Sequence, residues 1–346
     1  MKKMFAVFLA AVLLLCMCTP LCSACAGTRN ASVTFVPGIG FTWTYPAEPD
    51  TGENGSGETR DRQSAGLLSA VRRILADSGT FTFTAYGRGH GVGMSQLGAV
   101  EYGRQGRSYD WILRHYYPGV SLLRETPPDV VTYDGKTRDT EDFLIRAVQQ
   151  EIGGAANAEA YKAQAVAVYS ILKSGNYSLT AGDVSCSASA DYRLSSAVRS
   201  AVRSVLGQYL SYGGETVNAV FFACSAGKTT DSKSVWGVKV PYLNGGVDSP
   251  ETVSVSVSVV TAKGLKRMVR RYNAAHPEKT ITLSGDPAQW LEIVSCDGAR
   301  GDTGYVTSIR VGSMTMSGHA FRTMYNMYRP SGTAALNSHC FSVRFS

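Results

Sequence analysis

The segment Gly87-Arg-Gly-His-Gly-Val-Gly-Met-Ser-Gln96 combines the side chains and the backbone that a ligand site needs. Four glycines between positions 87 and 93 bracket His90, and glycine adopts positive φ angles and lets a ligand approach the backbone. A helix is expected to begin near Ser95, where free backbone amides bind polar ligands. The spacing fits neither a dinucleotide-binding fingerprint nor a phosphate loop. We predict a tight loop in which His90, Ser95 and Gln96 contact a substrate; the alternative is a glycine turn with a surface histidine.

Glu151 is the candidate for acid chemistry. It follows the apolar helical run at residues 143–148 and precedes Gly153-Gly154. An acid placed where an apolar helix gives way to glycines can lose part of its hydration while a substrate still reaches it, and desolvation favours a protonated carboxyl group. Cleavage of a glycosidic bond needs such an acid to protonate the leaving oxygen. The alternative is a solvated glutamate at a helix end.

Three blocks of the sequence resemble the stage II sporulation protein D (SpoIID/LytB) family of peptidoglycan-processing proteins. The first covers residues 89–119 and ends in the amphipathic helix Tyr109-Asp-Trp-Ile-Leu-Arg-His-Tyr-Tyr-Pro-Gly119, which its proline and last glycine terminate. The other two blocks are Ala147-Val-Gln-Gln-Glu-Ile152 with Glu159-Ala-Tyr-Lys-Ala-Gln-Ala-Val-Ala167, and Phe221-Phe-Ala-Cys-Ser-Ala-Gly-Lys-Thr229 with Val235-Trp-Gly237 and Pro241-Tyr-Leu243. Together they are spread over most of residues 81–346.

The resemblance implies an activity and a set of site residues. Family enzymes of this type are lytic transglycosylases that cut between N-acetylmuramic acid and N-acetylglucosamine, and the family glutamate corresponds to Glu151. The same carboxylate can then act as a base on the muramoyl 6-hydroxyl, so no second acid is needed. The matching blocks add five candidates for contacts with a glycan: Lys162, Gln164, Ser225, Lys228 and Thr229. Helix packing and an ordinary turn are the alternatives for these residues.

Two other functions remain open within the resemblance. The chain could be a non-catalytic amidase enhancer that binds the wall and activates a partner amidase, or a wall-binding module. Ala226 stands where the family turn has a glycine. In family terms the protein acts in cell-wall remodelling or in engulfment during sporulation, with peptidoglycan glycan strands as its partner.

The order of the blocks indicates a circular permutation. In the family the glutamate block comes first and the Gly-His-Gly block last, whereas here residues 81–126 precede Glu151. The C-terminal segment Phe341-Ser-Val-Arg-Phe-Ser346 is the kind of strand after which the family would continue into Phe81. Permutation is tolerated where the old termini lie close together on the surface. We therefore expect Ser346 to lie near Phe81, His90 to face Glu151, and residues 127–140 to form the new connection.

The N-terminus predicts export. Met1-Lys-Lys-Met4 precedes the apolar run at residues 5–15, and Ala24-Cys-Ala26 is a small-x-small cleavage site, so cleavage after Ala26 is the first expectation. A lipoprotein at Cys25 and an uncleaved membrane anchor over residues 4–27 are the alternatives. Each places the body of the protein outside the cytoplasm, secreted or associated with membrane or wall.

Composition sets wider bounds on partners. The chain has 346 residues, 44% hydrophobic and 18% charged, with a formal net charge of +7. This charge is compatible with anionic cell-wall polymers or lipid head groups, and equally with a solvated surface. No arginine-rich or aromatic-interleaved run indicates nucleic acid, so no nucleic-acid partner is expected.

Four cysteines follow the export segment: Cys186, Cys224, Cys296 and Cys340. In an exported chain they permit two disulfides with three connectivities, none of which is required. Some family members bind zinc through a Cys/His cluster after the helix that contains Glu159, but here residues 183–192 hold one cysteine and no histidine. We predict no zinc and no cofactor.

The hydrophobic pattern predicts an α+β fold in which mixed sheets pack with helices, without regular βαβ alternation. Residues 27–80 are expected to form a tether with a short helix at 66–76, and residues 81–346 a single SpoIID-like domain with the glutamate-containing core at 141–346. Asn157 is a good N-cap for a helix over residues 158–173. The other elements expected are a helix at 195–206, a hairpin at 209–215 and strands at 217–222, 253–259, 281–283, 291–295 and 305–311.

Overall fold

The computed structural model describes residues 32–36, 40–44, 79–153, 156–186, 193–301 and 303–346. The export segment, most of the tether expected at 27–80 and the helix expected at 66–76 lie outside the described residues. Within residues 32–44, β1 (Ser32–Val36) and β2 (Gly40–Thr44) pair as an antiparallel hairpin. From Gly79 to the C-terminus the fold is α+β, as predicted, with several small sheets packed against helices.

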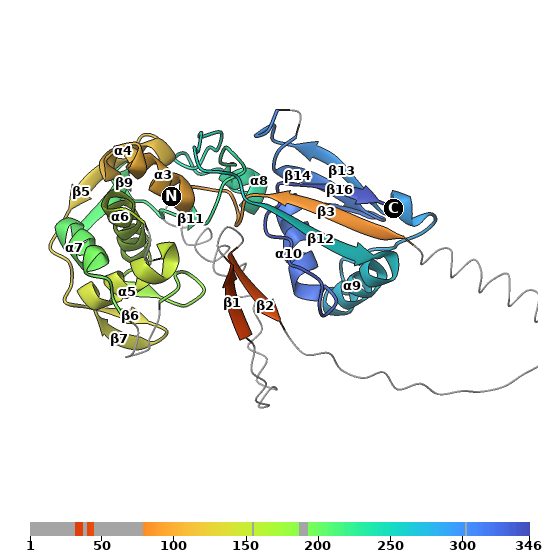
Figure 1. Cartoon of the computed structure of the whole chain (residues 1–346), viewed down its shortest axis with the longest axis horizontal. Helices are drawn as coiled ribbons and strands as arrows, with labels where there is room; N and C mark the ends of the chain where they lie inside the picture. The colour runs from red at the N-terminus through yellow and green to blue at the C-terminus, as the bar shows by residue number, and fades with distance from the viewer. Residues whose placement is uncertain (1–31, 37–39, 45–78, 154–155, 187–192, 302) are drawn as a thin grey trace, which may run out of the picture.

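Two lobes make up the chain from Gly79, and each has a large hydrophobic core (Figure 1). The first lobe contains β4 (Met94–Ser95), α3 (Gln96–Arg104), α4 (Tyr109–Tyr116), β5 (Ser121–Arg124), β6 (Val130–Tyr133), β7 (Lys136–Asp139), α5 (Thr140–Ile152), α6 (Ala158–Ser174), β8 (Ser178–Leu179), α7 (Ser196–Val205), β9 (Gln208–Tyr212), β10 (Glu215–Thr216), β11 (Phe221–Phe222) and α8 (Ser232–Trp236). The second contains β3 (Thr80–Tyr86), β12 (Val255–Thr261), α9 (Ala262–Ala275), the 3₁₀ turn η1 (Pro287–Gln289), β13 (Leu291–Cys296), β14 (Val306–Val311), β15 (Met314–Met316), α10 (Gly318–Tyr328) and β16 (Phe341–Phe345).

Helix α6 is the centre of the first lobe. Asn157 caps it as the sequence predicts, because its side-chain oxygen accepts a hydrogen bond from Ala160 N at 3.0 Å. Its alanines at 160, 163, 165 and 167 are buried, and α3, α4, α5, α7 and β9 all contact the helix. Small side chains let these neighbours approach closely, so one helix positions most of the lobe.

The second lobe is organised by the antiparallel sheet β12-β3-β16. The ring of Phe83 lies on its inner face against the rings of Phe321, Tyr325 and Phe341. Strand β12 is half-buried, as its alternating pattern predicts, but the serine Ser258 faces the core and donates to Ala334 O at 2.7 Å. Val255, Val257 and Val259 therefore face solvent, because a strand can present only alternate residues to one face, whereas Val260 is buried in the core together with Ser258.

Two predicted strands differ in the structure. The strand expected at 217–222 is reduced to Phe221–Phe222. Val217 and Ala219 are buried, as a core strand would require, but their backbone is irregular. Residues 281–283 form no strand. Instead, the side-chain amide of Asn273 hydrogen-bonds both backbone groups of Ile281. It donates to the Ile281 carbonyl and accepts from the Ile281 N–H, both at 2.8 Å. A side chain here satisfies the backbone groups that a neighbouring strand would bind.

The C-terminus lies beside the start of β3. Thr80 N donates to Ser346 O at 2.7 Å, Ser346 N donates to Thr80 O at 3.0 Å, and Phe345 is in register with Phe81. Ser346 and Phe81 therefore lie close together, as the permutation requires.

Two chain segments cross between the lobes. Residues 87–93 lead from β3 to β4, and residues 223–254 lead back from β11 to β12. They are paired where they meet, because Arg88 N donates to Cys224 O at 2.7 Å and Cys224 N donates to Arg88 O at 3.1 Å. The Gly-His-Gly loop is thus part of the junction between the lobes.

Candidate functional site

The glycines of the Gly-His-Gly loop allow the chain to pass through this junction. Gly87, Gly89, Gly91 and Gly93 have φ angles of +77°, +110°, +75° and +78°. A Cβ atom at Gly93 would lie 2.0 Å from the Val220 carbonyl oxygen, and one at Gly91 would lie 2.6 Å from the Tyr305 ring. Both the backbone angles and the close packing therefore require glycine.

The His90 ring lies between aromatic side chains. Its centroid is 5.2 Å from that of Trp236 and 5.7 Å from that of Phe222. Nδ1 accepts a hydrogen bond from Val92 N at 3.2 Å, so in the neutral ring the proton is on Nε2. Burial lowers the pKa of His90 to about 3, with a further contribution from the positive charge of Arg322. His90 is thus neutral at physiological pH and only partly exposed.

A buried carboxylate joins two of the predicted site residues. Glu251 Oε1 accepts from Ser95 Oγ at 2.5 Å and from Ser225 N at 2.7 Å. Ser95 also caps α3 by accepting from Gly98 N. Glu251 is 8% exposed, and its other oxygen, Oε2, has no partner in the described residues. The sequence analysis did not identify Glu251, because a single acid in a loop after Pro250 has no distinguishing pattern.

Helices α3 and α4 fix the segment that carries Glu251. Tyr116 OH and Ser249 Oγ are 2.5 Å apart, and His115 Nε2 lies 2.7 Å from Asp248 O. Burial raises the pKa of Tyr116 well above its usual value, so this hydroxyl stays neutral. Tyr102 of α3 also donates from its hydroxyl to Asp248 O at 3.1 Å, so the Glu251 segment is held by α4 and by α3, the helix whose N-cap residue Glu251 binds.

The turn that follows β11 is built from buried polar residues. Ser225 Oγ accepts from Gly227 N at 3.0 Å, and Thr229 Oγ1 accepts from Val247 N at 3.1 Å. Lys228, in contrast, is largely exposed and forms an ion pair with Asp248 at 3.5 Å. Gln96 is buried next to Ser95. Ser225 and Thr229 thus stabilise the turn in this conformation, and Lys228 offers a charge to a ligand.

Two further histidines lie close to His90. His319 and His339 make an edge-on contact with centroids 5.7 Å apart, and neither ring nitrogen of His339 has a partner among the described residues. Burial lowers the pKa of His319 to about 4 and that of His339 well below its usual value. No group of three His, Cys, Asp or Glu side chains in the described residues is arranged to hold a metal ion.

Glu151 lies in the last turn of α5, in a separate place from the Glu251 cluster. Its Oε1 accepts a hydrogen bond from Ser185 N at 2.5 Å. Gly153 ends the helix with a φ of +77°, and a Cβ there would meet nothing within 4 Å. The predicted facing of Glu151 and His90 stays a prediction, since no contact among the described residues joins them. The Glu151 side chain is partly exposed.

The remaining predicted residues lie on α6. Lys162 Nζ binds the Glu159 carboxylate at 2.7 Å, and the same carboxylate accepts from Tyr109 N, the first residue of α4. Glu159 therefore stabilises the start of α4 as well as its own helix. Gln164 is fully buried, and its side-chain oxygen and nitrogen have no partner in the described part of the chain. In this conformation Gln164 cannot touch a glycan.

The body cysteines form no disulfide in the described structure. Burial raises the pKa of Cys186 to about 11 and that of Cys340 to about 12, so both stay protonated thiols. No helix of the described residues is long and apolar enough to span a bilayer.

Comparison with known proteins finds relatives that each match a short part of the chain. Over 61 residues, 18% of this chain and 18% of the relative, it is 48% identical to stage II sporulation protein D of Bacillus amyloliquefaciens. It is 41% identical to the same protein of Bacillus subtilis over an equal length. Over 49 residues, 14% of this chain and 7% of the relative, it is 48% identical to an amidase enhancer of Bacillus subtilis.

These matches confirm the resemblance to the SpoIID/LytB family over about 60 residues. The chain spans less than a fifth of the length of the curated relatives that it matches. No protein-family profile matches the chain.

Proposed function

We propose that this protein binds peptidoglycan outside the cytoplasm and cleaves its glycan strands between N-acetylmuramic acid and N-acetylglucosamine, with Glu151 as the acid. The observation that carries the proposal is the Glu151 carboxyl group in the last turn of α5, which is partly exposed and held by a backbone amide. Ser185 N holds one carboxylate oxygen, and no partner in the described residues engages the other. The names of the relatives support a role in sporulation.

In this mechanism one carboxyl group acts twice. Glu151 first donates its proton to the glycosidic oxygen, and the bond from that oxygen to the muramoyl C1 breaks. The muramoyl 6-hydroxyl oxygen then bonds to C1 and gives its proton to the Glu151 carboxylate. The product is a 1,6-anhydro sugar, and no water is consumed. Ser185 N fixes the carboxylate through both steps, because it can donate to the oxygen that does not carry the proton.

The junction between the lobes would bind the glycan strand and take no part in its cleavage. His90 is neutral, and with Trp236 it presents a ring surface to a ligand. Neutral rings suit the uncharged faces of sugars better than a charged side chain does. Lys228, exposed in the turn after β11 and paired with Asp248, is a further proposed contact. These groups are the proposed contacts for the glycan strand.

A second candidate function rests on the match to the amidase enhancer. In that case the protein binds the wall and stimulates a partner amidase without breaking a bond itself. Glu151 would then have no chemical role, so substitution of this residue discriminates between the two functions.

The test uses purified protein and glycan strands without stem peptides, with mass spectrometry to detect anhydro-muramoyl ends. Glu151→Gln should lower cleavage by about 10²–10⁴-fold, the usual contribution of a general acid, and should leave binding intact. Glu141→Gln is the matched control, since it lies on the same helix in an exposed ion pair with Arg203. Cleavage by Glu151→Gln within a few-fold of wild type would eliminate Glu151 as the acid. Stimulation of an added amidase without cleavage by the wild-type protein would establish the second function.

A further inference from the structure

Strand β12 forms one edge of the sheet β12-β3-β16, and its outer edge is unpaired within the described residues (Figure 1). Ser254 O accepts from Gly87 N at 2.7 Å, and the pairing with β3 then continues through β12 without a register shift. Because antiparallel bonding alternates along a strand, the N–H and C=O groups of Val255, Val257 and Val259 point away from β3. No backbone hydrogen bond among the described residues uses these groups.

The same three valines also expose their side chains. Val255, Val257 and Val259 are 58%, 55% and 49% exposed on the outer face of the sheet. The strand contains no charged residue, no proline and no bulge, which are the features that usually protect an edge strand from pairing with another chain. The opposite edge strand, β16, contains the exposed Arg344 and contacts β13. The edge of β12 is therefore the unprotected one.

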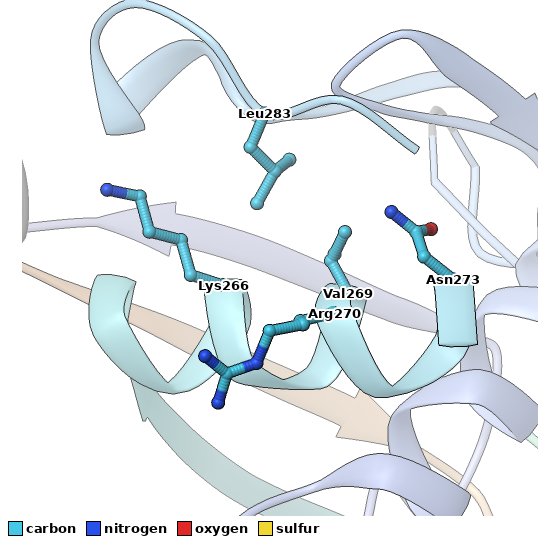
Figure 2. A pocket seen from close by; sticks show the side chains of 5 residues that line it. All are labelled: Lys266, Val269, Arg270, Asn273 and Leu283. Carbon is cyan, nitrogen blue, oxygen red and sulfur yellow. The ribbon is translucent and has the colours of Figure 1, made fainter. Parts of the chain in front are cut away.

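The shape of this surface suits an extended strand. Two hollows of the second lobe border α9, and neither is lined by a residue of β12. The larger, of about 260 Å³, lies between α9 and Leu283 (Figure 2). The valines of β12 instead form an exposed row beside free backbone groups. Such an edge binds an added strand through main-chain hydrogen bonds.

The sequence of β12 indicates which strand fits its edge. Residues 253–259 read Val-Ser-Val-Ser-Val-Ser-Val, which is the same in both directions. Two copies in antiparallel pairing can therefore place valine opposite valine and serine opposite serine. With a two-fold axis at Val257, that residue lies opposite its own copy, and Val255 lies opposite Val259 of the second copy. The outward-pointing backbone groups then form about six hydrogen bonds, two for each hydrogen-bonded pair.

We propose that two copies of this protein associate through antiparallel pairing of their β12 strands, which joins the two β12-β3-β16 sheets into one continuous sheet. The interface is isologous, because the same strand serves both partners. Cross-strand pairs of valines along the outer face add to the backbone hydrogen bonds. The assembly stops at the dimer, because β12 of each copy is then paired and the β16 edge is charged.

The test measures the mass of the purified protein by sedimentation equilibrium over a wide range of concentrations. The wild type should show a monomer–dimer equilibrium. Val257→Lys should raise the dissociation constant by roughly tenfold or more, because like charges lie directly opposite each other in the pair. Val294→Lys is the matched control, since Val294 is a 56% exposed valine of β13 in the same lobe, and it should leave the dissociation constant unchanged. Both variants replace exposed side chains and should keep the wild-type melting temperature.

A charge exchange tests the two-fold axis. Val257→Glu alone should also dissociate the dimer, whereas an equal mixture of Val257→Lys and Val257→Glu should restore it, because each lysine then faces a glutamate. A dimer that Val257→Lys leaves intact, or a mixture of the two folded variants that stays monomeric, would overturn the proposal.

The wild type tests the proposal independently of these variants. A mass that stays monomeric at every concentration, or that grows beyond the dimer, would refute the pairing. A monomeric wild type that dimerises only after deletion of residues 32–44 would show that the β1–β2 hairpin of the same chain occupies the edge. None of these results depends on glycan cleavage.

Discussion

The carboxylate of Glu251 offers a direct test of how the lobe junction is held together. Glu251→Ala leaves Ser95 Oγ and Ser225 N, both on fully buried residues, without their acceptor. A buried donor that loses its partner costs about 1–3 kcal/mol. The free energy of unfolding should therefore fall by roughly 2–6 kcal/mol, from the two unsatisfied donors together.

Glu251→Gln removes the negative charge of the side chain but keeps an oxygen that can accept hydrogen bonds, so it tests the two contributions separately. The amide oxygen can still accept from both donors, and the amide nitrogen takes the place of Oε2, which has no donor facing it in the described residues. Hydrogen bonds to a charged acceptor are about twice as strong as those to a neutral one, but burying a charge is itself unfavourable. These two effects oppose each other, but the buried amide N–H groups at the position of Oε2 have no acceptor among the described residues, so we expect the variant to be about 1–3 kcal/mol less stable than wild type.

Urea unfolding followed by circular dichroism measures both differences, with the exposed Glu215→Ala as control. Hydrogen exchange adds a local readout, because the Ser225 amide should exchange faster in Glu251→Ala. A stability of Glu251→Ala within about 0.5 kcal/mol of wild type, the range of ordinary surface substitutions, would refute the reasoning. Equal losses in the alanine and glutamine variants would show that the charge, and not the acceptor, holds the junction.

Two further predictions follow from the same region. Acidification from pH 7 to 5 should lower the free energy of unfolding by about 2 kcal/mol for each of His90, His319 and His339, because burial holds their folded pKa values below the unfolded value near 6.5. This stability is complete above pH 6.5 and is lost as the pH falls toward the folded pKa values. His339→Phe should remove about a third of the effect in denaturation curves at the two pH values, and an unchanged pH dependence would contradict the assignment. We also propose that the chain is a circular permutant. Moving residues 81–126 to follow Ser346 through a short Gly/Ser linker should then give a protein with a cooperative unfolding transition, because Thr80 and Ser346 are hydrogen-bonded. Loss of that transition would count against the permutation.

The elements that the sequence predicts well are those with local signals. The cap at Asn157 and the helix start after Ser95 depend on contacts three residues away, and both are confirmed. The strand expected at 281–283 failed because Asn273 binds the backbone of Ile281, and no pattern within those three residues reports such a contact. On β12, alternation predicted a half-buried strand but not that Ser258 would face the core, since the choice of face depends on partners such as Tyr325.

The candidate site also contains residues that local patterns predict and residues that only long-range contacts bring together. Ser95 and Ser225 could be selected from their segments, but their shared partner Glu251 is 156 residues from Ser95 in the chain. A pairing over that distance cannot be inferred from one sequence.

The geometry of the junction also explains why the glycine-rich loop could be recognised while its surroundings could not. The loop must pass beside Val220 and Tyr305 with almost no room, so glycine is required at positions that long-range packing determines. The same crowding buries His90 among aromatic rings and keeps it neutral. A glycine turn and a ligand-binding loop are therefore not competing descriptions of this segment. The turn places a neutral histidine and an N-capped helix at the crossing of the two lobes, where a long ligand could contact both.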